Sequence, residues 1–362
     1  MIKIWCSISS HGYGHAGQII PILNELAKII PDVEVIFRTM VPGEFFEHKL
    51  QVKWVLQEGQ QDIGCLQRGP LEIDIEGTWK AYHQFHQGWT EKVKKEAEAI
   101  GKSEVDLVIS NISHLGIAAA SEAGKPAVAI ASLSWDRILG YLGPLQSDWQ
   151  QKILLCIQEA YAKTSHLIRL YPGIDMPAFP RTSNVGPSFL NCPSRVADIR
   201  KILSLNSEDQ LVLVAFGGVP FTRFPLNGLQ SLTGYHFIVS GISVPDSFSR
   251  ISCWERLNVP FLEVLSQCDI VLTKPGYSTM VTAIHYGIPI VYVRRDNFLE
   301  ESNLVEYAHQ YGRAYELTRG DFESGSWEPA LNRVRDLPLP LVPPPQDGPR
   351  QAAEVLETFL RS

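Results

Sequence analysis

The sequence lacks the patterns that mark several broad classes of protein. Its six cysteines form no CxxC pair and no Cys/His cluster with zinc spacing, so it shows neither a disulfide framework nor a zinc motif. No apolar run approaches the roughly 20 residues that a membrane-spanning helix needs. No block of basic residues occurs, and the formal net charge of −7 disfavours nonspecific binding to nucleic acid or to an anionic membrane.

What is present is the composition of an ordinary globular protein, with 45% hydrophobic and 20% charged residues in a chain of 362. This length is sufficient for two domains that each bury a core. Free buried thiols are typical of a reducing compartment, and the apolar residues at the N-terminus are too few and too soon interrupted for a signal peptide. We therefore predict a cytoplasmic protein with no transmembrane segment and no nucleic-acid partner.

Short apolar runs alternate with longer amphipathic ones, which predicts strands connected by helices and a mostly parallel sheet. The first strand is expected at 2–8 and the first helix at 18–30. Further strands are expected at 33–37, 52–56, 106–110, 127–131, 167–170, 211–216, 235–240, 269–273 and 288–293. We predict an α/β protein with an N-terminal domain over 1–170, a proline-rich linker over 171–195, a C-terminal domain over 196–336, and a tail with a closing helix over 337–362.

A glycine-bracketed loop follows the first predicted strand, in the segment Ser9-Ser10-His11-Gly12-Tyr13-Gly14-His15-Ala16-Gly17. Such a loop presents free backbone N–H groups, and the helix behind it adds positive potential, which suits a phosphate. His11 and His15 are candidates for the general base that takes a proton from a substrate hydroxyl, because free imidazole has a pKa of about 6.5. His15 stands where the helix begins, so the helix dipole disfavours its charged form. A neutral donor to phosphate is an equally open role.

The sequence allows two other interpretations of these histidines. Either side chain can instead form a hydrogen bond to a neighbouring loop. The glycines between the two histidines and the lack of an HExxH glutamate argue against a metal site, and we predict none.

A third element of the N-terminal half follows the strand at 127–131 as Ser132-Leu133-Ser134-Trp135-Asp136-Arg137. It is expected on the same sheet edge as His15, where Asp136 is a candidate to orient a histidine or an acceptor hydroxyl. Trp135 is a candidate to stack on a sugar face. The alternative is a helix cap formed by Ser134 and Asp136, with Trp135 in the core.

Two segments of the C-terminal half are candidates for holding a phosphate. The strand at 211–216 runs into Gly217 and Gly218, which either let a ligand approach the backbone closely or form a plain exit turn. The strand at 269–273 ends in Lys274-Pro275-Gly276-Tyr277-Ser278-Thr279, where the two hydroxyls can cap a helix or bond phosphate oxygens. Position favours the ligand, because open α/β sheets bind at the carboxyl ends of their strands.

Charged residues gather after the next strand, in Val293-Arg294-Arg295-Asp296-Asn297-Phe298-Leu299-Glu300-Glu301-Ser302-Asn303. Arg294 or Arg295 is a candidate to neutralise a diphosphate. Glu300, Glu301 and Asn303 are candidates to bond sugar hydroxyls. The alternative is a solvated loop whose acids complement a helix dipole.

Together these motifs resemble those of GT-B glycosyltransferases. Gly12-Tyr13-Gly14-His15 is similar to the N-terminal glycine loop of that superfamily, and 268–279 with Gly287-Ile288-Pro289 is similar to the nucleotide-sugar half of its MurG-like and UDP-glycosyltransferase branches. Residues 274–279, 293–301 and 134–136 resemble the glycosyltransferase-like N-terminal region of plant L-arabinokinases, and the match covers most of the chain. The resemblance implies two Rossmann-like βαβ domains that face each other across a central cleft.

The sequence departs from these relatives in two ways. It has no GHMP-type glycine/serine phosphate loop, so the resemblance to L-arabinokinases brings no kinase. MurG-like proteins bind ribose through an acidic residue about three positions after the equivalent of Thr279, where this chain has Thr282. The glutamine-bearing sugar loop is replaced by Glu300-Glu301-Ser302. The usual ribose contact is therefore not implied here.

The resemblance implies a glycosyltransferase that moves a hexosyl or pentosyl unit from a nucleotide sugar, in the first place a UDP-sugar, to a small-molecule, saccharide or lipid acceptor. Inversion at the anomeric carbon is expected, without a metal or other cofactor. His15 or else His11 takes the acceptor proton, and the backbone at 217–218 and 276–279 stabilises the departing diphosphate. Two alternatives stay open, a nucleotide-sugar epimerase and a sugar-nucleotide-binding module without turnover.

Overall fold

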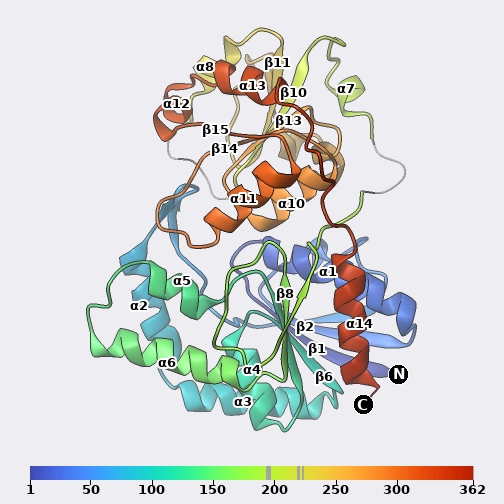
Figure 1. Ribbon diagram of the computed structural model, residues 1–362, viewed down its shortest axis with the longest axis vertical. Helices are drawn as coiled ribbons and strands as arrows, with labels where there is room; N and C mark the ends of the chain where they lie inside the picture. Colours follow the sequence, from blue (N-terminus) through green and yellow to red (C-terminus); the bar gives the residue numbers. More distant parts are fainter. Residues whose placement is uncertain (193–196, 218–220, 222–223, 362) are drawn as a thin grey trace.

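The computed structural model describes residues 1–192, 197–217, 221 and 224–361. Within these residues, parallel sheets of seven and six strands form the centres of an N-terminal and a C-terminal lobe, drawn below and above in Figure 1. The prediction of an α/β protein with two parallel sheets is confirmed. Gly218, one of the glycines predicted to meet a ligand, lies outside the described residues.

The N-terminal sheet has the strand order β3-β2-β1-β6-β7-β8-β9, and every neighbouring pair in it is parallel. Its strands are β1 (Ile2–Ile8), β2 (Val33–Thr39), β3 (Lys53–Glu58), β6 (Leu107–Asn111), β7 (Ala127–Ala131), β8 (His166–Leu170) and β9 (Thr182–Val185). The helices of this lobe are α1 (Gly14–Ile29), η1 (Gly43–Phe45), α2 (Ile75–His86), α3 (Trp89–Lys102), α4 (His114–Glu122), α5 (Trp135–Tyr141) and α6 (Asp148–Ala162).

The C-terminal sheet has the order β12-β11-β10-β13-β14-β15, again with parallel neighbours. Its strands are β10 (Gln210–Ala215), β11 (Tyr235–Val239), β12 (Ile251–Cys253), β13 (Ile270–Thr273), β14 (Ile290–Tyr292) and β15 (Ala314–Glu316). The helices are α7 (Ile199–Ile202), α8 (Leu226–Gln230), η2 (Trp254–Arg256), α9 (Phe261–Leu265), α10 (Tyr277–His285), α11 (Glu301–Tyr311), α12 (Arg319–Ser324) and α13 (Glu328–Arg335).

Strand β1 illustrates why the central strands are apolar on both faces. Ile4 and Cys6 belong to the same buried cluster as Ile19 and Leu23 of α1, whereas Trp5 belongs to the cluster that includes Ile117 of α4. Because helices cover both faces of a parallel sheet, side chains of either parity are buried, and the strand is a nearly continuous apolar run. This pattern is what made the strands predictable from the sequence.

The two lobes share one apolar cluster. The cluster beneath α1 continues into the C-terminal lobe, where it includes Met280 and Ile284 of α10. Helix α1 also contacts α10 directly. The lobes are therefore joined by buried apolar surface. Burial of such surface stabilises the contact by about 25 cal/mol for each Å² removed from water.

Three segments pack in places that the sequence pattern does not reveal. Strand β9, from the segment predicted as a linker, adds to the N-terminal sheet beside β8. Helix α14 (Gly348–Leu360), from the predicted tail, packs against α1 of the N-terminal lobe (Figure 1). The hairpin of β4 (Gln67–Gly69) and β5 (Glu72–Ile73) reaches the C-terminal lobe, where Leu71 joins the apolar cluster of that lobe. The domain limits themselves stay a prediction.

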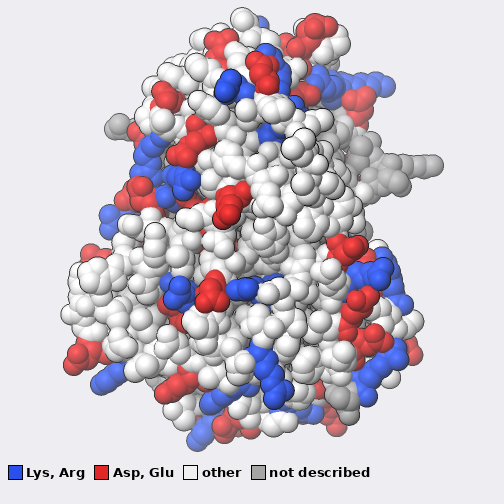
Figure 2. Space-filling model, viewed as in Figure 1, with Lys and Arg blue, Asp and Glu red and all other residues white. Residues whose placement is uncertain are grey.

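Positive and negative side chains are interspersed over the face shown in Figure 2. None of the described helices is both long and apolar enough to cross a membrane.

Candidate functional site

The two predicted phosphate loops lie face to face at the interface of the lobes. The first turn of α1 follows β1, and the first turn of α10 follows β13, so both stand at carboxyl ends of parallel strands. The Ser278 hydroxyl donates to the carbonyl oxygen of Gly14 over 3.1 Å. A Cβ atom at Gly14 or at Gly17 would lie 3.5 or 3.4 Å from the Ser278 Oγ. The glycines thus allow the close approach of the two loops, which touch each other.

His15 lies buried in the first turn of α1, and its ring is held by Asn111 at the end of β6. The distance between His15 Nδ1 and Asn111 Oδ1 is 2.6 Å. Because an amide oxygen only accepts, Nδ1 carries the proton and Nε2 is the basic nitrogen. Burial lowers the pKa of His15 to about 4, although the hydrogen bond to Asn111 acts in the opposite direction. His15 is therefore neutral at pH 7, as a general base must be.

Asn111 orients His15, which is one of the two roles for which Asp136 is a candidate in the sequence. Asp136 instead accepts a hydrogen bond from the Ser134 hydroxyl over 2.6 Å, at the start of α5. Asn111 is closer to His15 because β6 pairs directly with β1, which places the end of β6 beside the glycine loop. Asp136 therefore lies beside Ser134 at the start of α5, as in the alternative given for it, and a contact between Asp136 and an acceptor hydroxyl stays a prediction. Asp136 lines a separate hollow of about 470 Å³ beside α5 and α6.

His11 forms a hydrogen bond to a neighbouring loop, which is one of the alternatives given for either histidine. Its Nδ1 accepts a hydrogen bond from the backbone N–H of Cys65 over 3.2 Å. Burial lowers the pKa of His11 to about 3, and electrostatic interaction with His15, Lys274 and Arg295 acts in the same direction. With Nδ1 engaged, His11 fixes the position of the loop that precedes β4.

Trp135 is fully buried, so its faces are not available to a sugar in this structure, and the core position considered for it is the one found. Its indole N–H donates to Asp62 Oδ2 over 2.8 Å, and the Ser9 hydroxyl donates to Asp62 Oδ1 over the same distance. Burial raises the pKa of Asp62 to about 7. The Trp135 ring lies 5.4 Å from that of His11 and 5.6 Å from that of His15. Trp135 thus packs against the rings of both histidines.

In the C-terminal lobe, Lys274 projects from the end of β13 into buried surroundings. Its ammonium donates to Gln67 Oε1 of the β4–β5 hairpin over 3.1 Å. A Cβ atom at Gly217 would lie 3.9 Å from the Lys274 Nζ, so the glycine at the end of β10 and the lysine are neighbours. Burial and the charge of Arg295 lower the pKa of Lys274 to about 7, against the effect of Glu301.

The structure distinguishes the two arginines that follow β14. Arg295 is buried, donates to Glu301 Oε1 over 2.6 Å and to the carbonyl oxygen of Pro275 over 2.6 Å. Arg294 is largely exposed and pairs with Glu316 over 3.0 Å. Arg295 and Lys274 therefore form the pair of cations beside the first turn of α10, and Arg294 is directed elsewhere.

The remaining residues of this loop hold the lobes together. The Ser132 hydroxyl, at the end of β7, donates to Glu300 Oε1 over 2.6 Å, and Asn303 Nδ2 donates to the carbonyl oxygen of Gly173 over 2.9 Å. Burial raises the pKa of Glu300 to about 7. Burial also raises the pKa of Glu301, although Arg295 opposes this. In this structure the side chains of Glu300, Glu301 and Asn303 each contact protein.

The other predicted residues have mixed surroundings. Tyr277 is buried and donates from its hydroxyl to the carbonyl oxygen of Tyr171 over 2.8 Å, which is a structural contact. Gly276 is the residue before α10, and Thr279 is half-buried in its first turn. Gly12 has a φ angle of +77°, a conformation that glycine adopts without strain. Thr282, at the usual acidic position, is buried on α10.

Sequence reasoning missed Asn111 and Asp62. Asn111 directly follows the predicted strand at 106–110, and that position was a usable signal, since ligands bind where parallel strands end. Asp62 gave no such signal, because it lies in a polar stretch that is typical of an exposed loop. In the structure it is buried by Trp135 and Ser9.

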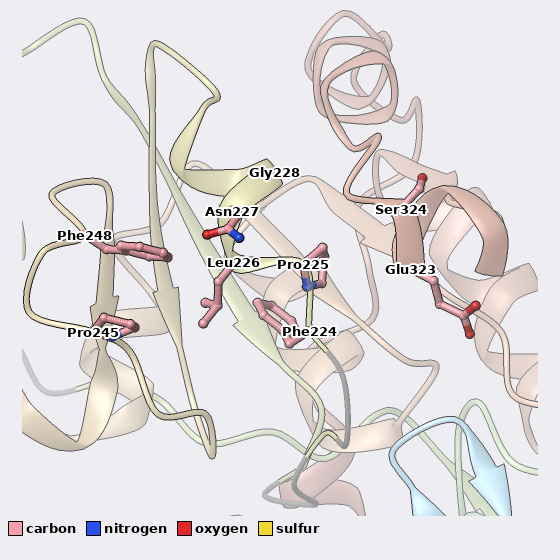
Figure 3. A pocket seen from close by; sticks show the side chains of 9 residues that line it. All are labelled: Phe224, Pro225, Leu226, Asn227, Gly228, Pro245, Phe248, Glu323 and Ser324. Carbon is pink, nitrogen blue, oxygen red and sulfur yellow. The ribbon is translucent and has the colours of Figure 1, made fainter.

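A second hollow, of about 510 Å³, lies in the C-terminal lobe, away from the predicted residues. It is lined by 224–228 of α8 and the turn before it, by Pro245 and Phe248 of the loop before β12, and by Glu323 and Ser324 of α12 (Figure 3). Among the described residues, no group of three or more His, Cys, Asp or Glu side chains is placed to hold a metal ion.

Comparison with known proteins supports the fold. No family model matches the chain. It is 27% identical over 336 residues to the L-arabinokinase of Arabidopsis thaliana, a match that covers 91% of this chain and 32% of that protein. The chain therefore spans about a third of the length of this relative.

Solved structures of similar fold include three glycosyltransferases. The spinosyn forosaminyltransferase SpnP is 15% identical with a TM-score of 0.61 and covers 100% of this chain and 95% of its own. UGT71G1 of Medicago truncatula, complexed with UDP-glucose, is 14% identical with a TM-score of 0.63, and the match covers 99% of this chain and 94% of UGT71G1. The calicheamicin glycosyltransferase CalG4 is 18% identical with a TM-score of 0.59, and the match covers 99% of this chain and 94% of CalG4. The chain has the GT-B fold that its motifs predicted.

Proposed function

We propose that this GT-B chain is a glycosyltransferase that uses a nucleotide sugar, in the first place a UDP-sugar, and transfers the sugar with inversion to a hydroxyl group. The observation that carries the proposal is the state of His15. It is buried, neutral at pH 7, and bonded through Nδ1 to Asn111 over 2.6 Å, so that its basic Nε2 is available to an acceptor.

The transfer is a direct displacement. The acceptor oxygen attacks the anomeric carbon as the bond from that carbon to the diphosphate oxygen breaks. The acceptor proton passes to His15 Nε2, and the diphosphate leaves from the opposite face of the sugar.

The negative charge that develops on the diphosphate requires stabilisation. Lys274 and Arg295 supply two cations, and the first turn of α10 supplies the positive end of a helix dipole. These groups support a mechanism without a metal ion. Contacts of Glu300, Glu301 and Asn303 with the sugar remain part of the proposal. At Glu301 and Asn303 the ligand must replace a protein partner that the side chain has in this structure. Glu300 binds Ser132 through Oε1, so a sugar hydroxyl would bind at Oε2 and leave the bond to Ser132 in place.

The kinase activity in the name of the relative is not part of the proposal, because the sequence contains no GHMP-type phosphate loop. The acceptor is proposed only as a class, a small molecule, saccharide or lipid that presents a hydroxyl. A cytoplasmic location is proposed from the free cysteines, which the described residues show unpaired.

The test begins with isothermal titration of UDP, GDP, ADP and dTDP into the full chain. Transfer and hydrolysis of the matching donor sugars are then measured with the wild type, His15→Ala and the exposed control His83→Ala. We expect His15→Ala to bind nucleotide normally and to lose about 10²–10⁴-fold in kcat, as for removal of a general base, while His83→Ala retains its activity.

Other outcomes assign the chain to another function. Free epimerised sugar released without an acceptor indicates an epimerase. Binding without turnover in the wild type indicates a binding module. Equal kcat values for the wild type and His15→Ala contradict the role of His15.

A further inference from the structure

A buried chain of hydrogen bonds joins His15 of the N-terminal lobe to Glu300 of the C-terminal lobe. His15 Nδ1 lies 2.6 Å from Asn111 Oδ1, and Asn111 Nδ2 lies 2.9 Å from Gln18 Oε1. Gln18 Nε2 lies 3.0 Å from Ser132 Oγ, and Ser132 Oγ lies 2.6 Å from Glu300 Oε1. We name this set of five side chains the His15–Glu300 chain.

The donors in the His15–Glu300 chain all point the same way. An amide group donates only from nitrogen and accepts only at oxygen, so Asn111 and Gln18 each receive a proton on one side and give one on the other. Ser132 accepts from Gln18 and has a single proton left to donate, which goes to the Glu300 carboxylate. Aligned hydrogen bonds polarise one another, so the negative charge of Glu300 favours a proton on His15 Nδ1.

All members of the His15–Glu300 chain are buried. When a buried polar group loses its hydrogen-bond partner, no water molecule replaces that partner. Each hydrogen bond of the set is therefore needed to keep the neighbouring side chains paired. Four members belong to the N-terminal lobe: His15 and Gln18 on α1, Asn111 at the end of β6, and Ser132 after β7. Glu300 alone comes from the C-terminal lobe, at the residue before α11.

We propose that Glu300 is a positioning residue for the transfer reaction, which holds His15 in the Nδ1–H tautomer through Ser132, Gln18 and Asn111 when the lobes are docked. The proposal rests on the function given above, in which Nε2 of His15 accepts the acceptor proton. Since Glu300 is the only member supplied by the other lobe, the basic nitrogen is presented to the acceptor only in the closed molecule. Separation of the lobes would remove the carboxylate from Ser132.

The charged groups around the two ends are few among the described residues. Arg295 and Glu301, from the same loop, act on the Glu300 carboxylate in opposite directions, and His11 lies beside His15 with ring centroids 6.3 Å apart. Burial is the main reason that the pKa of Glu300 is raised to about 7. At neutral pH the Glu300 side chain is therefore a mixture of the carboxylate and the carboxylic acid. The positioning effect therefore increases as the pH rises through this range.

The experiment uses nuclear magnetic resonance of the full chain labelled with ¹⁵N in histidine, which reports the tautomer without any turnover. Spectra of the wild type, Ser132→Ala, Glu300→Ala and the exposed control Glu306→Gln on α11 are compared. We expect His15 in the wild type and in Glu306→Gln to carry its proton on Nδ1. In Ser132→Ala and Glu300→Ala we expect a mixture of the two tautomers, and kcat about tenfold lower.

A rescue variant separates positioning from a direct sugar contact. Asn111→Asp places a carboxylate next to His15 Nδ1 and makes the remote one unnecessary. In this background we expect Glu300→Ala to change kcat by less than about twofold, because His15 is then oriented by the carboxylate at position 111 and no longer depends on Glu300. The affinity for the donor, measured by titration, is expected to change by less than about twofold in Ser132→Ala, because Ser132 is buried between Gln18 and Glu300.

Two results would overturn the proposal. One is a His15 that keeps its Nδ1–H tautomer in folded Ser132→Ala and Glu300→Ala. The other is a loss in Glu300→Ala that appears only as weaker donor binding and that Asn111→Asp does not rescue. Where either alanine variant does not fold, Glu300→Gln retains the shape without the charge, and the same tautomer measurement decides. A wild type with the expected tautomer and no transfer refutes the proposed function while the His15–Glu300 chain stands.

Discussion

The ammonium group of Lys274 lies 3.1 Å from the side-chain oxygen of Gln67, and this contact joins the C-terminal lobe to the β4–β5 hairpin of the other lobe. Beside it, Arg319 donates to the carbonyl oxygen of Leu71 over 2.6 Å. The hairpin therefore covers the lysine that is proposed to meet the diphosphate. Among the described residues the hydrogen-bond partner of this buried lysine is a neutral amide, which an anion can replace.

The pKa of Lys274, lowered to about 7 by burial and by Arg295, predicts pH-dependent nucleotide binding. An anion binds the charged form, and the charge is lost as the pH rises through 7, so the affinity for UDP should fall about tenfold between pH 6 and pH 8. Titration calorimetry across this range measures the effect.

Lys274→Arg is the matched control, because a guanidinium group remains charged over the whole range. Changes in the ionisation of UDP, Asp62 and Glu300 are common to both proteins and cancel in the comparison. The same slope in wild type and Lys274→Arg would show that Lys274 is not the titrating group.

The contact between Gly17 and Ser278 predicts how the lobe interface responds to added volume. A Cβ atom at Gly17 would lie 3.4 Å from the Ser278 Oγ, so Gly17→Ala makes an ordinary contact and should be as stable as the wild type or slightly more so. Gly17→Val adds branches with no room and should lower the free energy of unfolding by about 1–3 kcal/mol. Urea denaturation measures both variants. Ser278→Gly should recover part of the loss, and an equally stable Gly17→Val would contradict the close packing.

The hydrogen bond from Trp135 to Asp62 predicts a cost for removing one indole nitrogen. Trp135→Phe retains most of the apolar contact but leaves the buried Asp62 carboxyl with one donor fewer, which should cost about 1–3 kcal/mol in the free energy of unfolding. In an Asp62→Asn background the same substitution should cost less, as a double-mutant cycle would show. Trp149→Phe, at a partly exposed ring, serves as the control. Equal costs in both backgrounds would mean that the bond contributes nothing.

His114 predicts the sign of an acid effect on stability. It is fully buried at the start of α4, stacked on His86 and Trp89, and burial and the charge of His86 hold its pKa well below the usual value. The unfolded chain takes up this proton near pH 6.5 and the folded chain does not, so the stability due to the neutral ring is present above that pH and is lost below it.

The variant His114→Phe retains the stacking without a titrating group. Relative to it, the wild type should lose up to about 1.4 kcal/mol in free energy of unfolding for each pH unit below 6. Urea denaturation of both proteins between pH 7 and pH 5 measures the difference. Asp62 and Glu300 contribute to the pH dependence of stability with the opposite sign, but their contribution is the same in the wild type and in His114→Phe. A constant difference over this range would show that His114 is already charged in the folded protein.

The fold was largely predictable because its central strands are buried on both faces. Ile4, Trp5 and Cys6 are all apolar for this reason, and the same holds for the strands at 127–131 and 211–216. Strand β9 was not predictable, because Thr182–Val185 is a short edge strand with exposed polar residues in a proline-rich segment. Its position is determined by tertiary pairing with β8 and not by a local pattern.

The candidate site was predictable at the level of loops and less so at the level of partners. His15, Lys274 and Ser278 follow strands of two parallel sheets, and topology brings them to one interface. Which carboxylate or amide meets each of them depends on side-chain distances that no spacing encodes. Asn111 and Gln67 became partners through sheet order and a hairpin, and Glu300 through contact between lobes.

The return of α14 to α1 restricts how the two halves can move. The backbone leaves the N-terminal lobe after β9 and comes back to it before α14, so the upper lobe is attached at two places along its edge (Figure 1). Two covalent connections constrain the orientation of one lobe relative to the other more than a single linker would. Any relative motion of the lobes must therefore keep both connections at their attachment points.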